Sequence, residues 1–172
     1  KGNILPSQMV EKDGEMKLAF FAKDIPSKGY KCFELTEGTE NNEECMIVSK
    51  ARLENDFFSI DMDEKGTFTS MYDKKNDREV LKPGERGNVL QAFEDKPKNY
   101  DNWDIDIFYQ EKMWEVDDVE KIEVVENGAV MGKLRIYRKF QDSTIIQDIC
   151  IYRDISRIDF ETYVDWKEDQ VL

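Results

Sequence analysis

The sequence predicts an all-β protein, an antiparallel β-sandwich, and two observations carry this prediction. Towards the C-terminus, apolar residues recur at every second position over successive segments that end near residues 140, 152 and 166, and this period is typical of strands. Turn residues separate the segments, and few windows elsewhere show the i, i+3, i+4 spacing of a helix. A chain of 172 residues is long enough to bury one such core.

The region 119–166 is predicted to form a four-stranded antiparallel meander. Asn127-Gly128 separates segments 119–126 and 129–140, and both residues tolerate the positive φ that a type I′ hairpin turn requires. Segment 144–152 is largely apolar in both registers, as expected for a strand that is covered on both sides. The clearest alternation is in the last segment, where one face carries Ile158, Phe160, Thr162, Val164 and Trp166.

The N-terminal part predicts shorter strands joined by turns. Pro26 and Gly29 favour a turn, since one residue fixes φ and the other frees it. Asp61-x-Asp63-x-Lys65-Gly66 matches the start of a calcium loop, but Lys65 and Tyr72 occupy positions that need acids, so a hairpin turn is favoured. Segments 36–44 and 94–114 are expected to be loops. The predicted strands are 17–22, 31–35, 52–62, 68–72, 79–81, 89–93 and 105–109, the last within the second loop.

Charge and composition exclude several functions. The net charge is −13, from 25 basic and 38 acidic side chains, and such a surface repels both nucleic acid and anionic membranes. No run of about 18 apolar residues exists for a membrane span. Because the chain contains no histidine, it cannot build a Ser-His-Asp triad, a Cys-His pair or a His-ligated zinc site. Neither a catalytic residue nor a metal ligand is predicted within it.

The three cysteines form no metal-binding or disulfide framework. Cys32, Cys45 and Cys150 contain no CxxC pair. They are expected to be free thiols in a reducing compartment. The expected location is therefore the cytoplasm.

One short stretch has the residue types of a sugar-binding site. Tyr100 and Trp103 are interleaved with Asp104, Asp106 and a third aspartate within seven residues. Aromatic faces stack on pyranose rings, and carboxylates accept hydrogen bonds from sugar hydroxyls. The alternative is a loop whose aromatic residues pack on the edge of the sandwich while its acids face water. Both interpretations remain open at this point.

A series of ordered motifs carries a family resemblance. They are Leu18-Ala19-Phe20-x-Ala22-x-Asp24-Ile25-Pro26, Leu53-Glu54-Asn55-Asp56-Phe57-Phe58, Gly66-x-Phe68-x-Ser70-Met71-Tyr72-Asp73-Lys74, Arg78-Glu79-Val80-Leu81, Gly87-Asn88-x-Leu90-Gln91-x-Phe93-Glu94-Asp95-x-Pro97 and Tyr100-Asp101-x-Trp103-Asp104-Ile105-Asp106. Taken together they resemble the C-terminal β domain of glycoside hydrolase family 38, the α-mannosidases, and are nearest to its bacterial members.

The resemblance implies a division of the chain. Residues 1–50 would be the end of a small β segment with a connecting loop, and residues 51–172 the first part of the C-terminal sandwich. In the family this domain is a supersandwich similar to galactose mutarotase, so the sandwich in this chain is expected to be truncated. Uncovered strands in a truncated sandwich leave room for a homo-oligomer.

The resemblance also implies a function for the whole enzyme. Family members are retaining exo-α-mannosidases whose N-terminal domain carries a zinc ion and an Asp nucleophile. This chain would be inactive alone, would support that missing catalytic domain, and would bind α-mannoside glycans only within the full enzyme. The loop with Tyr100, Trp103, Asp104 and Asp106 would line part of the sugar pocket. The alternative is a stand-alone carbohydrate-binding or structural sandwich.

Overall fold

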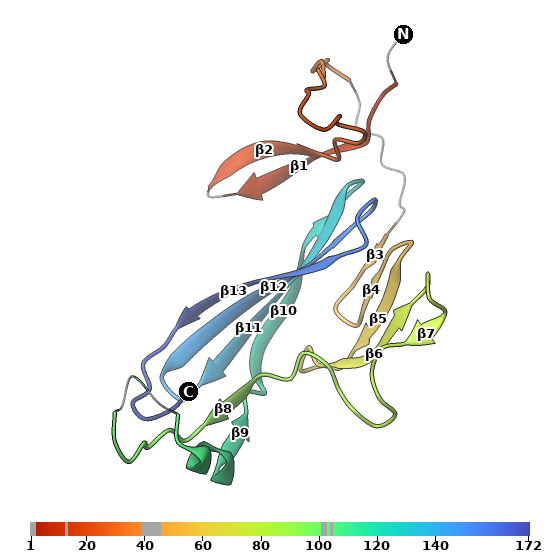
Figure 1. The fold of residues 1–172 in the computed structure, drawn as a ribbon. Helices are drawn as coiled ribbons and strands as arrows, with labels where there is room; N and C mark the ends of the chain where they lie inside the picture. Colours follow the sequence, from red (N-terminus) through yellow and green to blue (C-terminus); the bar gives the residue numbers. More distant parts are fainter. Residues whose placement is uncertain (1–2, 13, 39–45, 101–102, 104) are drawn as a thin grey trace.

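The computed structural model confirms the predicted all-β antiparallel sandwich. It describes residues 3–12, 14–38, 46–100, 103 and 105–172. Figure 1 shows two sheets in layers, an N-terminal hairpin beyond one end of them, and a loop with a short helix at the other end. The first sheet has the order β10-β11-β12-β13. Its strands are β10 (Asp118–Asn127), β11 (Met131–Phe140), β12 (Ser143–Tyr152) and β13 (Ile158–Asp165).

The second sheet is smaller and has the order β3-β4-β5-β6-β7. Every pairing in it is antiparallel and joins strands that are consecutive in the sequence. The turn at 63–66 between two of these strands confirms the predicted hairpin, because Asp63 Oδ1 accepts hydrogen bonds from the backbone of Lys65 and Thr67 at 3.0 and 2.9 Å. The strands are β3 (Ile47–Val48), β4 (Arg52–Glu54), β5 (Phe58–Met62), β6 (Phe68–Asp73) and β7 (Arg78–Glu79).

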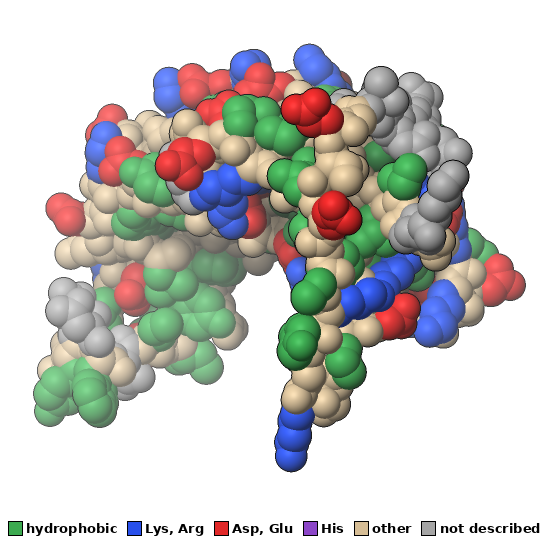
Figure 2. All heavy atoms as spheres, turned by 90° about the horizontal axis from the view of Figure 1, so that it is seen from above, with side chains coloured by type: hydrophobic (Ala, Val, Ile, Leu, Met, Phe, Trp, Pro, Cys, Tyr) green, Lys and Arg blue, Asp and Glu red, His purple; other side chains and the backbone are tan. Residues whose placement is uncertain are grey.

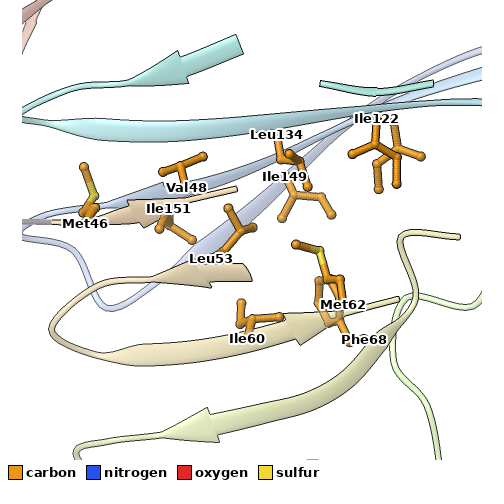
Figure 3. Close-up of a cluster of buried hydrophobic side chains, with 11 residues drawn as sticks. Met46, Val48, Leu53, Ile60, Met62, Phe68, Ile122, Leu134, Ile149 and Ile151 are labelled. Carbon is orange, nitrogen blue, oxygen red and sulfur yellow. The ribbon is translucent and has the colours of Figure 1, made fainter. Parts of the chain in front are cut away.

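The core lies between the two sheets. Leu134 and Ile149 of the large sheet and Leu53 and Ile60 of the small sheet are fully buried, and all four belong to one hydrophobic cluster. Figure 3 shows side chains from both layers directed toward one another. The alternation predicted from the sequence therefore places Leu134 and Ile136 of β11 and Ile149 and Ile151 of β12 in this interior.

The N-terminal hairpin differs from the prediction. Its strands are β1 (Ser7–Lys12) and β2 (Glu15–Phe20), which pair in antiparallel register, whereas strands were predicted at 17–22 and 31–35. Segment 31–35 has no regular secondary structure. Phe33 instead contacts the ring of Phe20 edge-on, at 5.1 Å between centroids, so this residue packs through its ring and not through a backbone ladder.

Two further predictions are corrected by local turns. The strand predicted at 52–62 is broken because Asn55 Oδ1 accepts hydrogen bonds from the backbone of Phe57 and Phe58, at 2.9 and 2.7 Å. The turn after β10 is not type I′. Neither Asn127 nor Gly128 has a positive φ, and Asn127 instead pairs with Gly132 at the end of the ladder.

Candidate functional site

The predicted sugar-binding stretch lies in a loop between two short strands. The strands β8 (Gln91–Phe93) and β9 (Met113–Glu115) pair with each other. Behind them, Ala92 and Val116 pack with Phe140 and Ile145 of the large sheet in a second buried cluster. The loop 94–112 therefore projects from a base that is packed on the sandwich.

Charged and aromatic contacts close the base of this loop. Glu94 accepts hydrogen bonds from Lys96 and Lys112, at 2.8 and 3.0 Å, and these bonds lower the pKa of Glu94. Phe93 and Tyr109 contact edge-on, with 5.3 Å between ring centroids. A strand was predicted at 105–109, but the structure has a 3-10 helix, η1 (Ile107–Glu111). The helix turns Tyr109 inward onto the base.

The two predicted aromatic residues stand out from the fold. Tyr100 is 77% exposed and Trp103 is 90% exposed. Tyr100 has a left-handed backbone, with φ of 62°, and its carbonyl accepts a hydrogen bond from the Trp103 backbone at 2.8 Å. The structure thus places both rings on one tight turn. It does not place them against the edge of the sandwich, which was the alternative interpretation.

Of the two predicted aspartates, Asp106 lies among the described residues and Asp104 does not. Asp106 Oδ2 accepts a hydrogen bond from the Lys98 backbone at 3.0 Å, and the Asp106 carbonyl accepts one from Tyr109 at 3.1 Å. One carboxylate oxygen of Asp106 therefore joins the two sides of the loop. Asp104 lies outside the described residues.

A hollow surface exists elsewhere in the fold. An apolar cavity of about 260 Å³ lies between β2 and the ends of β11 and β12, lined by residues that include Phe20, Met131 and Ile155. None of the predicted site residues lines it. The cavity offers few polar groups to fix the orientation of a sugar.

A charge cluster that could not be recognised from residue spacing lies on the outer face of the large sheet. Arg135 binds both carboxylate oxygens of Asp148, at 2.6 and 2.8 Å, and Lys133 lies 3.3 Å from Asp148 and from Glu161. Burial raises the pKa of Asp148, but the hydrogen bonds and charges of Arg135 and Lys133 outweigh it and leave that pKa lowered. These charges satisfy one another, and the neighbouring Cys150 thiol has a pKa raised to about 12 by burial. The cluster therefore offers no free acid, base or nucleophile.

The described residues do not fit a metal ion. Among them, no group of three His, Cys, Asp or Glu side chains could hold one. Within the same residues, no helix is long and apolar enough to cross a membrane.

Comparisons with known proteins agree on one family. A sequence model of the glycosyl hydrolases family 38 C-terminal domain matches residues 53–172. Alpha-mannosidase G of Dictyostelium discoideum is 30% identical over an alignment that covers 86% of this chain. The chain spans about 15% of the length of that relative.

Proposed function

The chain belongs to the family 38 C-terminal domain of the glycosyl hydrolases, and on this premise we propose that it is a non-catalytic part of a retaining α-mannosidase. The enzyme would hydrolyse terminal α-linked mannose. The match over residues 53–172 is the observation that carries the proposal. The absence of histidine supports it, since zinc chemistry of the kind this family uses must then come from another part of the polypeptide.

In this enzyme the sandwich supports the zinc-containing catalytic domain, and the loop 94–112 lines part of the sugar pocket. The exposed rings of Tyr100 and Trp103 are free to pack on the C–H face of a mannose ring. Among the described residues, the Lys98 backbone bonds to Oδ2 of Asp106, and we propose that Oδ1 accepts a hydrogen bond from a sugar hydroxyl. Asp104 is proposed to accept a second hydroxyl on the basis of the sequence alone.

The test is kinetic and uses the full-length polypeptide. We expect Trp103→Ala and Asp106→Asn each to lower kcat/KM on an aryl α-mannoside by about tenfold to a hundredfold, the loss of one stacking or charge-assisted contact. Tyr163→Ala is the control, because Tyr163 is 65% exposed on β13 and lies outside the loop. Wild-type values for both loop variants would remove the loop from the pocket.

A second candidate is a stand-alone carbohydrate-binding sandwich. The exposure of Tyr100 and Trp103 favours it, since both rings are accessible to a sugar without any other domain. Calorimetric titration of the 172-residue chain with mannose and short mannosides separates the candidates. Saturable heat would support the binding module, and no heat is expected if the loop needs the catalytic domain to complete its pocket.

We also propose a reducing compartment, the cytoplasm, for the enzyme. Cys32 and Cys150 are both free thiols, and Cys45 lies outside the described residues. All three should react with a thiol reagent after denaturation without prior reduction. Recovery of a single reactive thiol would indicate a disulfide and another compartment.

A further inference from the structure

The apolar cavity beside the N-terminal hairpin has walls from two separate parts of the chain. One wall is β2 and the residue after it, where Leu18 and Phe20 remain 39% and 40% exposed. The other wall is the start of β11, the end of β12 and the turn that follows, with Met131, Tyr152 and Ile155. Figure 2 looks down on the end of the molecule that carries the hairpin and shows hydrophobic side chains exposed among charged ones. A molecule that fills the cavity would remove apolar wall surface from water, which is favourable.

Two polar side chains of the walls already have partners. The Tyr152 hydroxyl donates a hydrogen bond to Asp159 at 2.7 Å, and Asp154 forms an ion pair with Lys23. Lys23 also lies over the ring of Phe21, another wall residue, with 5.4 Å from Nζ to the ring centroid. The ion pair therefore joins the chain just after the hairpin to the sandwich beside the cavity, and it neutralises the charge of Asp154.

The backbone of the sandwich wall is engaged as well. The amides of Val130 and Met131 donate hydrogen bonds to Gln8 at 3.2 and 3.0 Å. The Val130 carbonyl accepts a hydrogen bond from the Arg153 amide at 3.0 Å. A polar ligand would thus give up hydrogen bonds to water without finding these groups free in exchange, which costs free energy. An apolar molecule has no such bonds to lose, so the walls select for apolar ligands.

The volume of the cavity limits the ligand to a small molecule. The cavity has about 260 Å³. An apolar cavity of about 150 Å³ in a protein core is enough to bind benzene, whereas pockets for drug-sized ligands have about 300 to 1,000 Å³. This cavity lies between the two, so it suits one substituted aromatic ring or a branched alkyl group of similar size.

We propose that the cavity is a binding site for a small apolar molecule of the size of a single substituted aromatic ring. The inference does not depend on mannosidase activity, because none of the proposed sugar-binding residues lines the cavity. Since the walls come from the hairpin and from the sandwich, such a molecule binds only while the hairpin is closed. Occupancy of the cavity and closure of the hairpin are therefore coupled.

Amide hydrogen exchange with toluene as the probe tests this proposal in the 172-residue chain and in the full-length polypeptide. At a free toluene concentration ten times its Kd, exchange of β1 and β2 amides should slow about elevenfold, because only the closed hairpin binds. Amides of β9, at the opposite end of the sandwich, are the reference and should not change. Phenol, in which a hydroxyl replaces the methyl group, should bind at least about tenfold more weakly.

Two variants locate the bound probe. Ala19→Leu enlarges a residue that lines the cavity, and it should abolish the effect of toluene. Ala22→Leu is the matched control, because Ala22 is also half-buried but does not line the cavity, and the effect of toluene should persist. The comparison of toluene with phenol uses the unmodified chain, so it holds even where a variant fails to fold.

Several results would overturn the proposal. Hairpin exchange that does not change in a toluene-saturated solution would show that the probe does not bind, and equal slowing in β9 would show a general solvent effect. Equal slowing by phenol would show that polar groups recognise the ligand. An effect of toluene that persists in Ala19→Leu would place the probe elsewhere. An effect that is lost in the full-length polypeptide would show that another part of the protein fills the cavity.

Discussion

Replacing Gln8 with alanine tests how the N-terminal hairpin is held on the sandwich. Gln8 lies on β1 and is 7% exposed. Its Oε1 accepts hydrogen bonds from the backbone of Val130 and Met131, at 3.2 and 3.0 Å, and its Nε2 donates to Glu126 Oε2 at 3.0 Å. One side chain thus satisfies two backbone donors of the turn between β10 and β11. Without it these donors lose their acceptor.

The expected cost follows from these three bonds. A neutral hydrogen bond contributes about 1 kcal/mol and one to a charged group about 1.5 to 3 kcal/mol. The bonds are only partly buried, so water replaces some of the loss in the variant. We expect Gln8→Ala to lower the free energy that holds the hairpin closed by about 2 to 3 kcal/mol.

A double-mutant cycle with Gly128→Ala isolates the contact. A Cβ on Gly128 would overlap the amide end of Gln8, and the three nearest heavy atoms to it all belong to that side chain. Gly128 does not have a positive φ, so alanine adds no backbone strain there. Gly128→Ala should therefore displace Gln8 and cost about as much as Gln8→Ala, while it costs little when Gln8 is already alanine. The coupling energy should be about 2 kcal/mol.

Amide hydrogen exchange measures the free energy of opening the N-terminal hairpin, and therefore the coupling between Gln8 and Gly128. Amides of β1 and β2 report the opening of the hairpin, and amides of β12 in the core serve as the internal reference. Both single variants should speed exchange in the hairpin and leave β12 unchanged. Additive effects, with a coupling below about 0.5 kcal/mol, would refute the argument that Gln8 and Gly128 act as a unit.

Three other predictions concern the sandwich itself. Gly66→Ala should destabilise the chain by about 2 kcal/mol more than Gly84→Ala in urea unfolding. Both glycines have positive φ, but only at Gly66 would a Cβ overlap a side chain of β11. Equal losses of stability in the two variants would contradict this overlap. Ile149→Ala should cost about 2 to 5 kcal/mol, since Ile149 is fully buried, whereas Ile146→Ala on the outer face should cost less than about 1.5 kcal/mol. Hydrogen bonds from a serine hydroxyl and from backbone amides lower the pKa of the Glu79 carboxyl from 4.5 to about 2. The ionised Glu79 therefore stabilises the folded chain fully above pH 4.5, and this contribution is lost as the pH falls to about 2. Glu79→Gln should therefore flatten the pH dependence of unfolding in that window, and an unchanged slope would contradict the assignment.

The C-terminal meander could be predicted from sequence because its strands are long. β11 alternates between buried and more exposed residues over its ten positions, and β12 is buried on both faces over much of its length, so the register of this pair is well specified. The break at Asn55 could not be predicted in this way, since the apolar pattern continues through a turn that one side-chain oxygen creates. The N-terminal hairpin was misplaced for a related reason. Gln8 bonds to the backbone of Val130, which is distant in the sequence. Phe33 contacts Phe20 through its ring and lies outside any strand ladder.

For the candidate site, the sequence identified the residue types but not which side chains are exposed and which form hydrogen bonds within the protein. The sequence left open whether the aromatic residues face a sugar or pack on the edge of the sandwich, and Tyr100 and Trp103 are exposed. That Asp106 would close its own loop depends on the fold of 98–109 and is not visible in residue spacing. The pairing of Arg135 with Asp148 was also missed, because it depends on the cross-strand register that sets these two residues opposite each other.

The position of the loop depends on a polar junction between the two sheets. Asn88 has a left-handed backbone, with φ of 55°, and its Nδ2 donates to the Gly66 carbonyl at 2.9 Å and to Gln147 Oε1 at 3.0 Å. Arg138, almost fully buried, donates to the same Gln147 oxygen and to the Lys65 carbonyl, at 3.0 and 3.1 Å.

Burial lowers the pKa of Arg138 to about 10, so it remains a cation at neutral pH and polarises the oxygens it binds. The junction ties the 63–66 turn of the small sheet to β11 and β12 of the large one. Asn88 lies where the chain leaves the small sheet and turns toward β8. An apolar residue at this point could not make both bonds, and the Gly66 carbonyl and Gln147 would each lose a donor. The same contacts that align the two layers therefore also fix the direction in which the chain enters the loop, which is why an exposed loop can present its aromatic residues in a defined place.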